Sequence, residues 1–584
     1  MKLTSEQKNA VLADGCIAIT ACPGSGKTRV ICAKILSCID DIINSNRQLC
    51  CITYTRAAVD EVNSRIYSYL GREDYKEHLE IGTIHSFCLN NILRTNYFRH
   101  PDLASGFSIM SPDDEEYNEL VDGLLSKHGI QKKYKERFET LSRGCDPKWP
   151  ITPKIASEFW ESQIQRGLLD FDGIVYYSAE LVERHKFISR GLAAKFSWFL
   201  MDEFQDTTDA QIKILRAIAA HKTTAFFIVG DPYQSIFGFA GAKPEYLSQF
   251  ASEIDASEDF HLTGNFRSSD SIINLAENHL TRSRRMTPEG KTKSFNHVPV
   301  WYSCSNIAQS IKEHFVEKAE DLKINLNSCA IIGPNFYVLR DIARKLRALE
   351  VPVLGPGARP YKRSQHLIAP LIEELCADLD SLHDRRIGVV KNRLMELVQN
   401  CEGNICYELL SFKGDLIIAH SFSLARNIRQ TTSHATDFLI AFSEQLAKLL
   451  FDFEVVSCEG QKKITDSGPG MVADILQALD TSEDIKNYTV EDLGVFGGNQ
   501  NRIRMINLHK VKGREYDAVA MVNTLEGNLP YGSVSVGSEE EEAARRLFYV
   551  GVTRARKALM FFTDKKKDPS RFLHAVFPHG PIES

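Results

Sequence analysis

The chain has 584 residues, of which 43% are hydrophobic and 25% charged, and 70 Lys and Arg against 76 Asp and Glu give a net charge of -6. This composition excludes a mainly disordered chain, and at about 150 residues per domain it predicts roughly four domains. The negative balance excludes a uniformly basic nucleic-acid coat, so any nucleic-acid site must be local. Neither an apolar leader nor a run of about 18 apolar residues occurs, so we expect a cytoplasmic protein without a membrane partner.

Four short apolar runs in the first part of the chain end in polar or glycine-rich turns. They are CIAIT before Ala21, LCCIT before Tyr54, WFLM before Asp202 and AFFIVG before Asp231. Such runs are typical of buried parallel strands, and the helical pattern RVICAKILSCI after the first of them indicates an α/β fold. Ligands bind at the carboxyl ends of the strands in such sheets, so we expect the chemistry at these four turns.

A second set of similar runs predicts a second α/β lobe. They are VWYSC from Val300, CAII from Cys329, RMINL from Arg504, DAVAMV from Asp517 and KALMFF from Lys557. Helical patterns interrupt both lobes, and in the second one Leu367, Leu371, Leu375 and Leu379 recur at fourfold spacing. We therefore expect lobe 1A at 1–90 and 186–262, a helical insert 1B at 91–185, lobe 2A at 263–360 and 501–584, and a helical insert 2B at 361–500.

A phosphate-binding loop is indicated between the first apolar run and the helix that follows it. Its residues are Ala21, Cys22, Pro23, Gly24, Ser25, Gly26, Lys27 and Thr28. In this context backbone N–H groups and the helix N-terminus surround a phosphate, while Lys27 reaches the β- and γ-phosphates and Thr28 binds Mg²⁺. Ala21 replaces the first glycine of the usual pattern, and the alternative is a tight turn without a ligand.

Two adjacent acids, Asp202 and Glu203, directly follow the apolar run WFLM. At the end of a strand one carboxylate can hold Mg²⁺ while the next orients a water molecule. The alternative is a solvated acidic turn. We favour the catalytic interpretation because the chain already contains a phosphate loop.

A helix near the end of the chain is predicted to begin with a capping box formed by Ser538 and Glu541. Pairs of Glu541 with Arg545 and of Glu542 with Arg546 would support its first turns. We expect Arg554 to share one face of this helix with Ala543, Leu547 and Val550. A buried arginine needs an anion, which is either a phosphate or a carboxylate of the protein.

Ten motifs in order resemble those of the UvrD/Rep/PcrA group of superfamily I DNA helicases. They are LTSEQKNAV, ACPGSGKTR, TYTRAAVDEV, GTIHSF, LLDFDGIV, MDEFQDT, VGDPYQSIFGFAGA, LTGNFRSS, INLHKVKGREYDAV and LFYVGVTRAR. The resemblance spans nearly the whole chain. It implies two RecA-like P-loop NTPase lobes with parallel sheets, each carrying an inserted, mainly helical subdomain. ATP would bind in the cleft between the lobes, and single-stranded DNA would lie across their tops.

The resemblance also implies roles for single residues in ATP hydrolysis. Lys27 and Thr28 would hold phosphate and Mg²⁺, Asp202 would hold Mg²⁺, and Glu203 would activate water. Gln234 would sense the γ-phosphate, and Arg267 and Arg554 would be arginine fingers from the second lobe. The residues implied to contact adenine or ribose are Gln7, Arg29, Phe266 and Glu515.

Five residues fall on motifs that line the single-strand track in the family. They are Tyr54, His85, Phe237, Phe239 and His509. Aromatic rings can stack on bases without sequence preference, although each of these residues taken alone is more often part of a packed core. The chain departs from its family at Phe239 and Ala240, which stand where Trp and Arg are usual. The grip on the translocating base is therefore expected to be weaker.

Two functions of different classes remain. The first is an ATP hydrolase that acts as a 3′→5′ DNA helicase on single-stranded and tailed duplex DNA, with ATP and Mg²⁺ as cofactors. The second is a DNA-sensing ATPase subunit of a phage-defence or repair complex that serves a separate nuclease subunit, as in Gabija-type modules. Only 30 residues (584 minus 554) follow Arg554, so we expect no fused nuclease domain.

Overall fold

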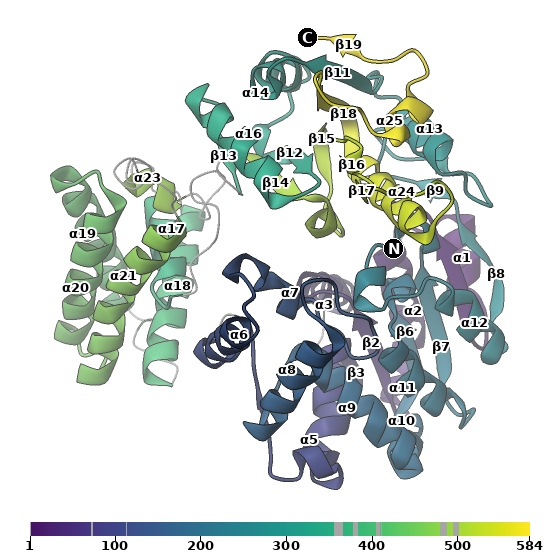
Figure 1. Ribbon diagram of the computed structural model, residues 1–584. Helices are drawn as coiled ribbons and strands as arrows, with labels where there is room; N and C mark the ends of the chain where they lie inside the picture. The colour runs from purple at the N-terminus through teal and green to yellow at the C-terminus, as the bar shows by residue number, and fades with distance from the viewer. Residues whose placement is uncertain are drawn as a thin grey trace. The chain divides into compact units, whose positions relative to one another are not determined.

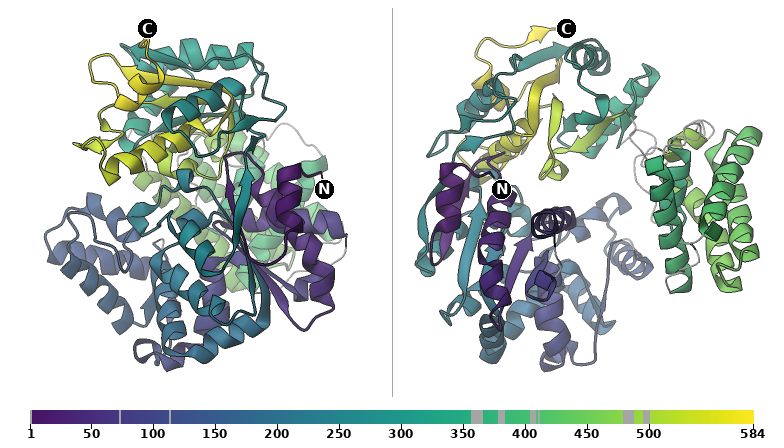
Figure 2. Two further views of the ribbon diagram at one scale, coloured as in Figure 1. Left: turned by 90° about the vertical axis from the view of Figure 1, so that its right-hand side faces the viewer. Right: turned by 180° about the vertical axis from the view of Figure 1, so that it is seen from behind.

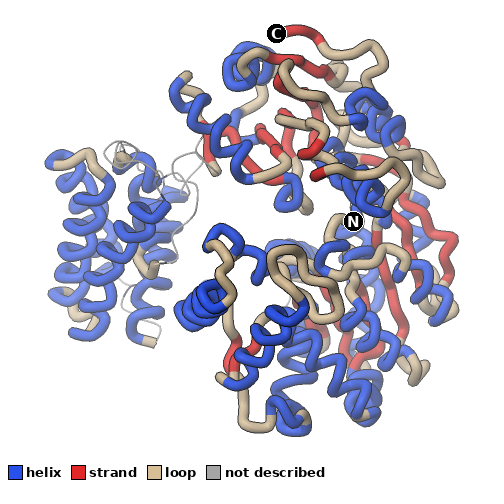
Figure 3. The backbone as a smooth tube through the Cα atoms, in the orientation of Figure 1, coloured by secondary structure: helices blue, strands red, loops and turns tan. Residues whose placement is uncertain are grey.

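The computed structural model describes residues 2–71, 74–112, 114–355, 366–377, 384–403, 409, 412–478, 488–494 and 501–584. The chain forms two compact units, of which the first comprises Met1–His297 and Val534–Thr553 and the second Val298–Ser533 and Arg554–Ser584. Both contain helices and strands, as the colours of Figure 3 show. Among the described residues, no helix has the length and apolar character that crossing a bilayer requires.

The first unit contains a six-stranded sheet in which all neighbouring strands pair in parallel. Its strands are β1 (Ile17–Ala21), β2 (Gln48–Thr53), β3 (Leu79–Thr83), β6 (Phe196–Met201), β7 (Ala225–Gly230) and β8 (Ser257–Leu262). Their order is β3-β2-β6-β7-β1-β8 (Figure 1). The four apolar runs of the sequence are the four central strands, which confirms that prediction. The edge strand β8 has no such run, because its residues are mostly polar and half of them are exposed.

Helices cover both faces of this sheet (Figure 2). One face packs against α1 (Ser5–Leu12), α2 (Lys27–Ile43) and α3 (Arg56–Leu70). The other packs against α4 (Ile84–Cys88), α9 (Phe171–Arg184), α10 (Lys186–Lys195), α11 (Asp209–Ala219) and α12 (Tyr246–Glu253). Along β1, Ile17 and Ile19 enter the first core and Ala18 enters the second. Alternation between two apolar cores explains why each central strand is a continuous apolar run.

The helical insert of the first unit has an apolar core of its own, built from residues between Met110 and Leu168. Its elements are β4 (Ser108–Ile109), α6 (Glu115–Lys127), η5 (Lys132–Tyr134), α7 (Glu136–Glu139), α8 (Pro153–Gln165) and β5 (Leu168–Leu169). Residues 91–185 were expected to form this insert. Within that range, α9 instead packs into the core beneath the sheet. The separate core is therefore shorter than the expected insert.

The first unit continues beyond the expected end of lobe 1A at residue 262. It also holds β9 (Gly264–Asn265), α13 (Asp270–His279) and β10 (Thr287–Pro288), and from the far end of the chain α24 (Glu539–Val552). Ser538 caps α24 by accepting a hydrogen bond from the Glu541 N–H, as predicted. The capping box is only half formed, because the Ser538 N–H donates to the Ser535 carbonyl at 3.3 Å. The Glu541 carboxylate accepts from the Gly537 N–H and lies 3.8 Å from Arg545. We expected Arg546 to pair with Glu542. Its Nε instead donates a hydrogen bond to the Ser235 carbonyl at 2.9 Å.

The second unit contains a seven-stranded sheet, again with parallel pairs throughout. Its strands are β11 (Val300–Cys304), β12 (Cys329–Gly333), β13 (Val353–Leu354), β14 (Ile503–Asn507), β15 (Tyr516–Val522), β18 (Ala555–Asp564) and β19 (Ile582–Glu583), in the order β13-β14-β12-β15-β18-β11-β19. Its helices are α14 (Ile307–Ser310), α15 (Glu317–Asp321), α16 (Phe336–Ala348) and α25 (Arg571–Val576). The five apolar runs of the sequence are five of these strands, which confirms the second α/β fold.

The second unit also contains a segment with a separate apolar core, whose described elements are helices. Its helices are α17 (Ala369–Cys376), α18 (Asp384–Glu402), α19 (Phe412–Thr431), α20 (Ala435–Asp452), α21 (Cys458–Ala478) and α23 (Val490–Leu493). Leu371 and Leu375 are buried in this core and Leu367 packs against it, as their spacing predicts. Leu379 lies outside the described residues, as does the expected start of the insert at residue 361.

Candidate functional site

The predicted phosphate loop connects β1 to α2 in the first unit. Gly24 and Gly26 have φ values of 70° and 83°, in the left-handed region that favours glycine. Gly26 is the N-cap of α2 and supplies no side chain to the first-turn N–H groups, which leaves those groups to an anion. A Cβ on Gly24 would lie 2.6 Å from the Cβ of Arg267, so only glycine fits there. The loop geometry is that of a phosphate cradle.

Several residues of the phosphate loop are themselves buried. Pro23 and Ser25 are buried, and the Cys22 thiol donates to the Thr263 carbonyl at 3.4 Å. Burial raises the pKa of Cys22 to about 12, so this thiol is protonated and packs as a small apolar group. The cysteines of the chain were expected to be reduced and mostly buried, and Cys22 is both.

Lys27, the first residue of α2, lies 3.4 Å from a carboxylate oxygen of Glu203. Burial alone would lower the pKa of Lys27, but the carboxylates of Glu203 and Asp231 outweigh it and raise the pKa. Lys27 is therefore a cation, available to a phosphate. Burial and the neighbouring Glu203 raise the pKa of Asp202 to about 7. Two acids and one lysine thus meet at the carboxyl ends of β1 and β6.

Glu203 has a φ of 53°, which is uncommon for a residue with a side chain. Its N–H donates to Asp202 Oδ1 at 2.9 Å, and its carboxylate accepts from Gln205 Nε2 at 2.5 Å. Gln205 is fully buried, and its side-chain oxygen Oε1 accepts from the Asp231 N–H at 2.8 Å. Gln205 therefore connects the turn after β6 to the turn after β7, a positioning role that its place in the motif did not reveal.

Gln234 and Asp231 form a hydrogen-bonded pair after β7, with Gln234 Nε2 donating to Asp231 Oδ2 at 2.6 Å. Asp231 is fully buried and forms an ion pair with the buried Arg282 at 2.9 Å. Arg282 also donates to the Tyr549 hydroxyl on α24 and to the Ala21 carbonyl in the phosphate loop. Sequence reasoning missed Arg282, since TRSRR contains three arginines and nothing in the pattern marks the buried one.

The donors available for a metal fit Mg²⁺. No group of three or more His, Cys, Asp or Glu side chains suited to a metal occurs among the described residues. Mg²⁺ does not need one, because it commonly binds one or two carboxylates together with substrate phosphates and water. The Asp202 carboxylate and the Thr28 hydroxyl in the first turn of α2 are oxygen donors of the required kind.

Two of the residues expected near adenine contact the phosphate loop. Gln7 Nε2 donates to the Ser25 carbonyl at 2.8 Å, and Gln7 closes a capping box with Thr4 at the start of α1. The Phe266 N–H donates to the Gly24 carbonyl at 3.0 Å. Arg29 is exposed on α2. The structure thus brings Gln7 and Phe266 to the loop, and Arg29 lies in the first turn of α2 directly after it.

Arg267 belongs to the same compact unit as the phosphate loop, whereas we expected it in the second lobe. Its Nη1 donates to the Thr553 carbonyl at 3.2 Å. Arg554 belongs to the second unit and is buried, with its Nη1 donating to the Arg514 carbonyl at 3.4 Å. It does not share a helical face with Val550 as expected, because α24 ends at Val552. The second unit also holds His509, within η13 (Leu508–Val511), and Glu515, which contacts Arg556.

Three aromatic residues expected on the DNA track form one group. Tyr54 stacks on Phe237 with ring centroids 5.2 Å apart, and Phe237 meets Phe239 edge-on at 6.0 Å. Tyr54 is 46% exposed, which keeps this group open to a ligand. His85 lies apart from them, edge-on to Phe171 at 5.6 Å, and burial lowers its pKa. His85 is therefore neutral near pH 7.

Comparison with known proteins agrees with the order of the motifs. The UvrD/REP helicase N-terminal domain matches residues 3–255, and the UvrD-like helicase C-terminal domain matches residues 411–566. The ATP-dependent DNA helicase Rep of Buchnera aphidicola is 24% identical over 98% of this chain and 98% of its own. DNA helicase II of Haemophilus influenzae is 25% identical over 100% of this chain and 88% of its own. The ATP-dependent DNA helicase Rep of Escherichia coli is 24% identical over 98% of this chain and 94% of its own.

Proposed function

Because the chain belongs to the UvrD/Rep/PcrA-like DNA helicases, we propose that it uses ATP to move 3′→5′ along single-stranded DNA and to unwind tailed duplex. The observation that carries this proposal is the meeting of Lys27, Asp202 and Glu203 at the carboxyl end of a parallel sheet. The turn after β7 at this end leads to the half-buried Phe237, on which the exposed Tyr54 stacks. A nucleotide site and a base-stacking surface thus belong to the same compact unit.

In this mechanism the phosphate loop and Lys27 bind the phosphates, and Asp202 with Thr28 would hold Mg²⁺. The ion would neutralise charge on the transferring phosphoryl group. The ion pair of Lys27 and Glu203 exchanges for one between Lys27 and phosphate, which frees the Glu203 carboxylate to take a proton from the attacking water. Gln234, held by its hydrogen bond to Asp231, would sense the γ-phosphate. Arg267 and Arg554 would supply positive charge to the transition state.

The aromatic group offers sequence-tolerant contacts to the strand. Stacking on Tyr54, Phe237 or Phe239 uses the π face that every base has, which suits a motor that must move over any sequence. Phe237 and Phe239 lie three and five residues after Gln234 in the chain. A movement of Gln234 when the γ-phosphate is lost would therefore be transmitted to the two rings through a short stretch of backbone. This supports coupling of hydrolysis to movement on DNA.

The test is ATP hydrolysis and strand displacement with 3′-tailed, 5′-tailed and blunt duplexes. We expect single-stranded DNA to stimulate hydrolysis and only the 3′-tailed duplex to be unwound. Hydrolysis that saturating single-stranded DNA does not change would exclude the motor. DNA-stimulated hydrolysis without displacement of any duplex would instead support the DNA-sensing subunit of a nuclease complex, and co-purification with a nuclease would then be the next measurement.

A further inference from the structure

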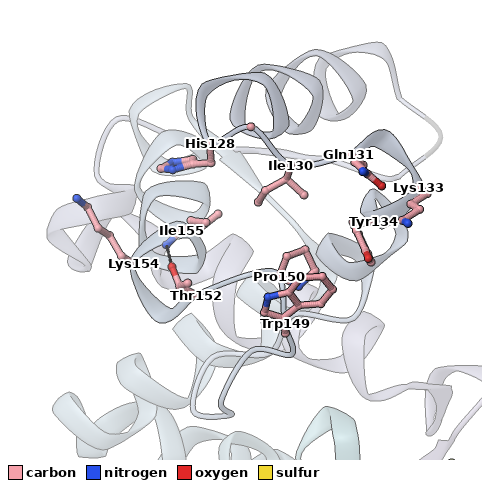
Figure 4. A pocket seen from close by; sticks show the side chains of 11 residues that line it. His128, Ile130, Gln131, Lys133, Tyr134, Trp149, Pro150, Thr152, Lys154 and Ile155 are labelled. Carbon is pink, nitrogen blue, oxygen red and sulfur yellow. Dashed lines mark hydrogen bonds between the residues drawn. The ribbon is translucent and has the colours of Figure 1, made fainter. Parts of the chain in front are cut away.

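The helical insert of the first unit contains a cavity of about 590 Å³ between the end of α6 and the start of α8 (Figure 4). This volume falls in the range of about 300–1,000 Å³ that is usual for small-ligand sites. The side chains lining it come from the loop after α6, from η5, from the loop before α8 and from the first turn of α8. They are His128, Ile130, Gln131, Lys133, Tyr134, Trp149, Pro150, Thr152, Lys154 and Ile155.

The lining combines an open aromatic ring with positive charge. Trp149 is 75% exposed, and its ring meets Tyr134 edge-on at 5.3 Å. Lys133 and Lys154 lie on opposite sides of the cavity in Figure 4, and no carboxylate is among the lining residues. An exposed indole with two flanking ammonium groups suits a ligand that has both a flat ring and negative charge, which is the chemistry of a nucleotide in a strand.

The loop that carries Trp149 also reaches the aromatic group expected to bind DNA. The ammonium group of Lys148, the residue before Trp149, lies 5.2 Å from the ring centroid of Phe239. A Cβ on Gly241 would lie 2.8 Å from the sulfur of Cys145. The loop therefore packs against the turn of Phe239, and Lys148, which contacts Phe239, directly precedes Trp149 in the chain.

We propose that the Trp149 cavity binds a nucleotide of the same single strand that lies on Phe237 and Phe239. The base stacks on Trp149, Lys133 and Lys154 contact the flanking phosphates, and Lys148 neutralises the phosphate between the two sites. This proposal rests on the proposed function, since it needs a strand on the aromatic group. It adds a contact that none of the ten sequence motifs contains, because Trp149 lies in none of them.

The first test compares affinities for oligothymidylates from about 4 to 16 nucleotides long, the span of common single-strand sites. Trp149→Ala should weaken binding of the longer oligonucleotides about tenfold, the contribution of one base platform, and leave the shortest ones unchanged. Lys133→Ala should weaken the longer ones and make binding less dependent on salt. Lys132→Ala is the matched control, since Lys132 is 84% exposed and does not line the cavity.

The second test uses the emission of Trp149, one of four tryptophans in the chain. A long oligonucleotide should quench emission of the wild-type protein, and Trp149→Phe should abolish most of that quenching while keeping part of the affinity. Melting temperatures of all variants report folding, which the exposed Trp149 side chain should hardly affect. If Trp149→Ala binds every length as the wild type does, the cavity proposal is wrong and a protein partner becomes its remaining occupant. Failure of DNA to bind or stimulate the wild type would remove the proposed function as well.

Discussion

At the phosphate loop, Lys27 and Glu203 form an ion pair. Removal of the Lys27 side chain and removal of the Glu203 carboxylate should affect different steps of the reaction. We expect Glu203→Gln to lower kcat by about 10²–10⁴, the usual contribution of a general base, with nucleotide affinity retained. Lys27→Ala should weaken nucleotide binding itself, because it removes a phosphate contact. Steady-state hydrolysis and titration with a fluorescent nucleotide separate the two. Hydrolysis by Glu203→Gln within a few-fold of wild type would show that Glu203 is not the base.

Arg282 shows how much can depend on one buried charge. It pairs with the fully buried Asp231 and donates to Tyr549 and to the phosphate loop. We expect Arg282→Ala to lower the free energy of unfolding by about 3–5 kcal/mol, because Asp231 would remain buried without its partner. Arg284→Ala is the control, since Arg284 is exposed and its removal should change stability by at most about 0.5 kcal/mol. Equal unfolding curves for the two variants would show that Asp231 finds another partner.

At the scale of elements, the turn η8 (Gly238–Ala240) after β7 presents Phe239 beside Phe237 and Tyr54. We expect Phe239→Ala to cost about 1–3 kcal/mol of single-strand affinity, the range of a base platform. Phe239→Trp should leave ATP hydrolysis intact and raise unwinding processivity, because indole offers a larger π face. DNA affinity and melting temperature should be measured on the same preparation. Reduced stability with unchanged affinity would remove Phe239 from the track.

The contact between α13 and α24 should depend on pH. His279 donates from Nε2 to the Arg545 carbonyl, and burial lowers its pKa to about 4. The unfolded chain takes up this proton near pH 6.5, whereas the folded chain stays neutral until about pH 4, so acid favours unfolding. We expect a loss of about 2 kcal/mol between about pH 7 and 5, which His279→Gln should largely remove. Urea unfolding at each pH measures this loss. His579→Gln, at an exposed position, is the control.

The same elements show what the sequence can and cannot reveal. Strands buried on both faces, such as β1 and β7, are continuous apolar runs and could be predicted. The edge strand β8 could not, because its partly exposed residues SEDFHL have no apolar pattern. The roles of Gln205 and Arg282 could not be predicted, because both depend on contacts with the buried Asp231 that join segments distant in the sequence. The loop and the acids could be expected from the sequence because local spacing places them at strand ends, whereas the aromatic group was expected only from the resemblance to the helicase family.

At the scale of the molecule, the two predicted arginine fingers lie in different compact units. Arg267 belongs to the unit of the phosphate loop, and Arg554 belongs to the other. We expect Arg267→Ala and Arg554→Ala each to lower hydrolysis by about 10³ while nucleotide binding persists, because a finger acts mainly on transition-state charge. Single-turnover hydrolysis and melting temperature check this. A normal rate per folded molecule with lower stability in Arg554→Ala would make it a structural residue.

Helix α24 belongs to the first unit although it follows most of the second unit in the sequence, and this order affects how the chain folds during synthesis. On the ribosome, residues up to His297 emerge before the whole stretch from 298 to 533, and α24 follows only after that stretch. Until then Arg282 lacks the Tyr549 hydroxyl and His279 lacks the Arg545 carbonyl. The nucleotide-binding unit is therefore the first to begin folding but cannot finish before most of the second unit has been synthesised. A fragment ending at residue 297 would remain an intermediate, with the apolar contacts of α24 exposed to chaperones.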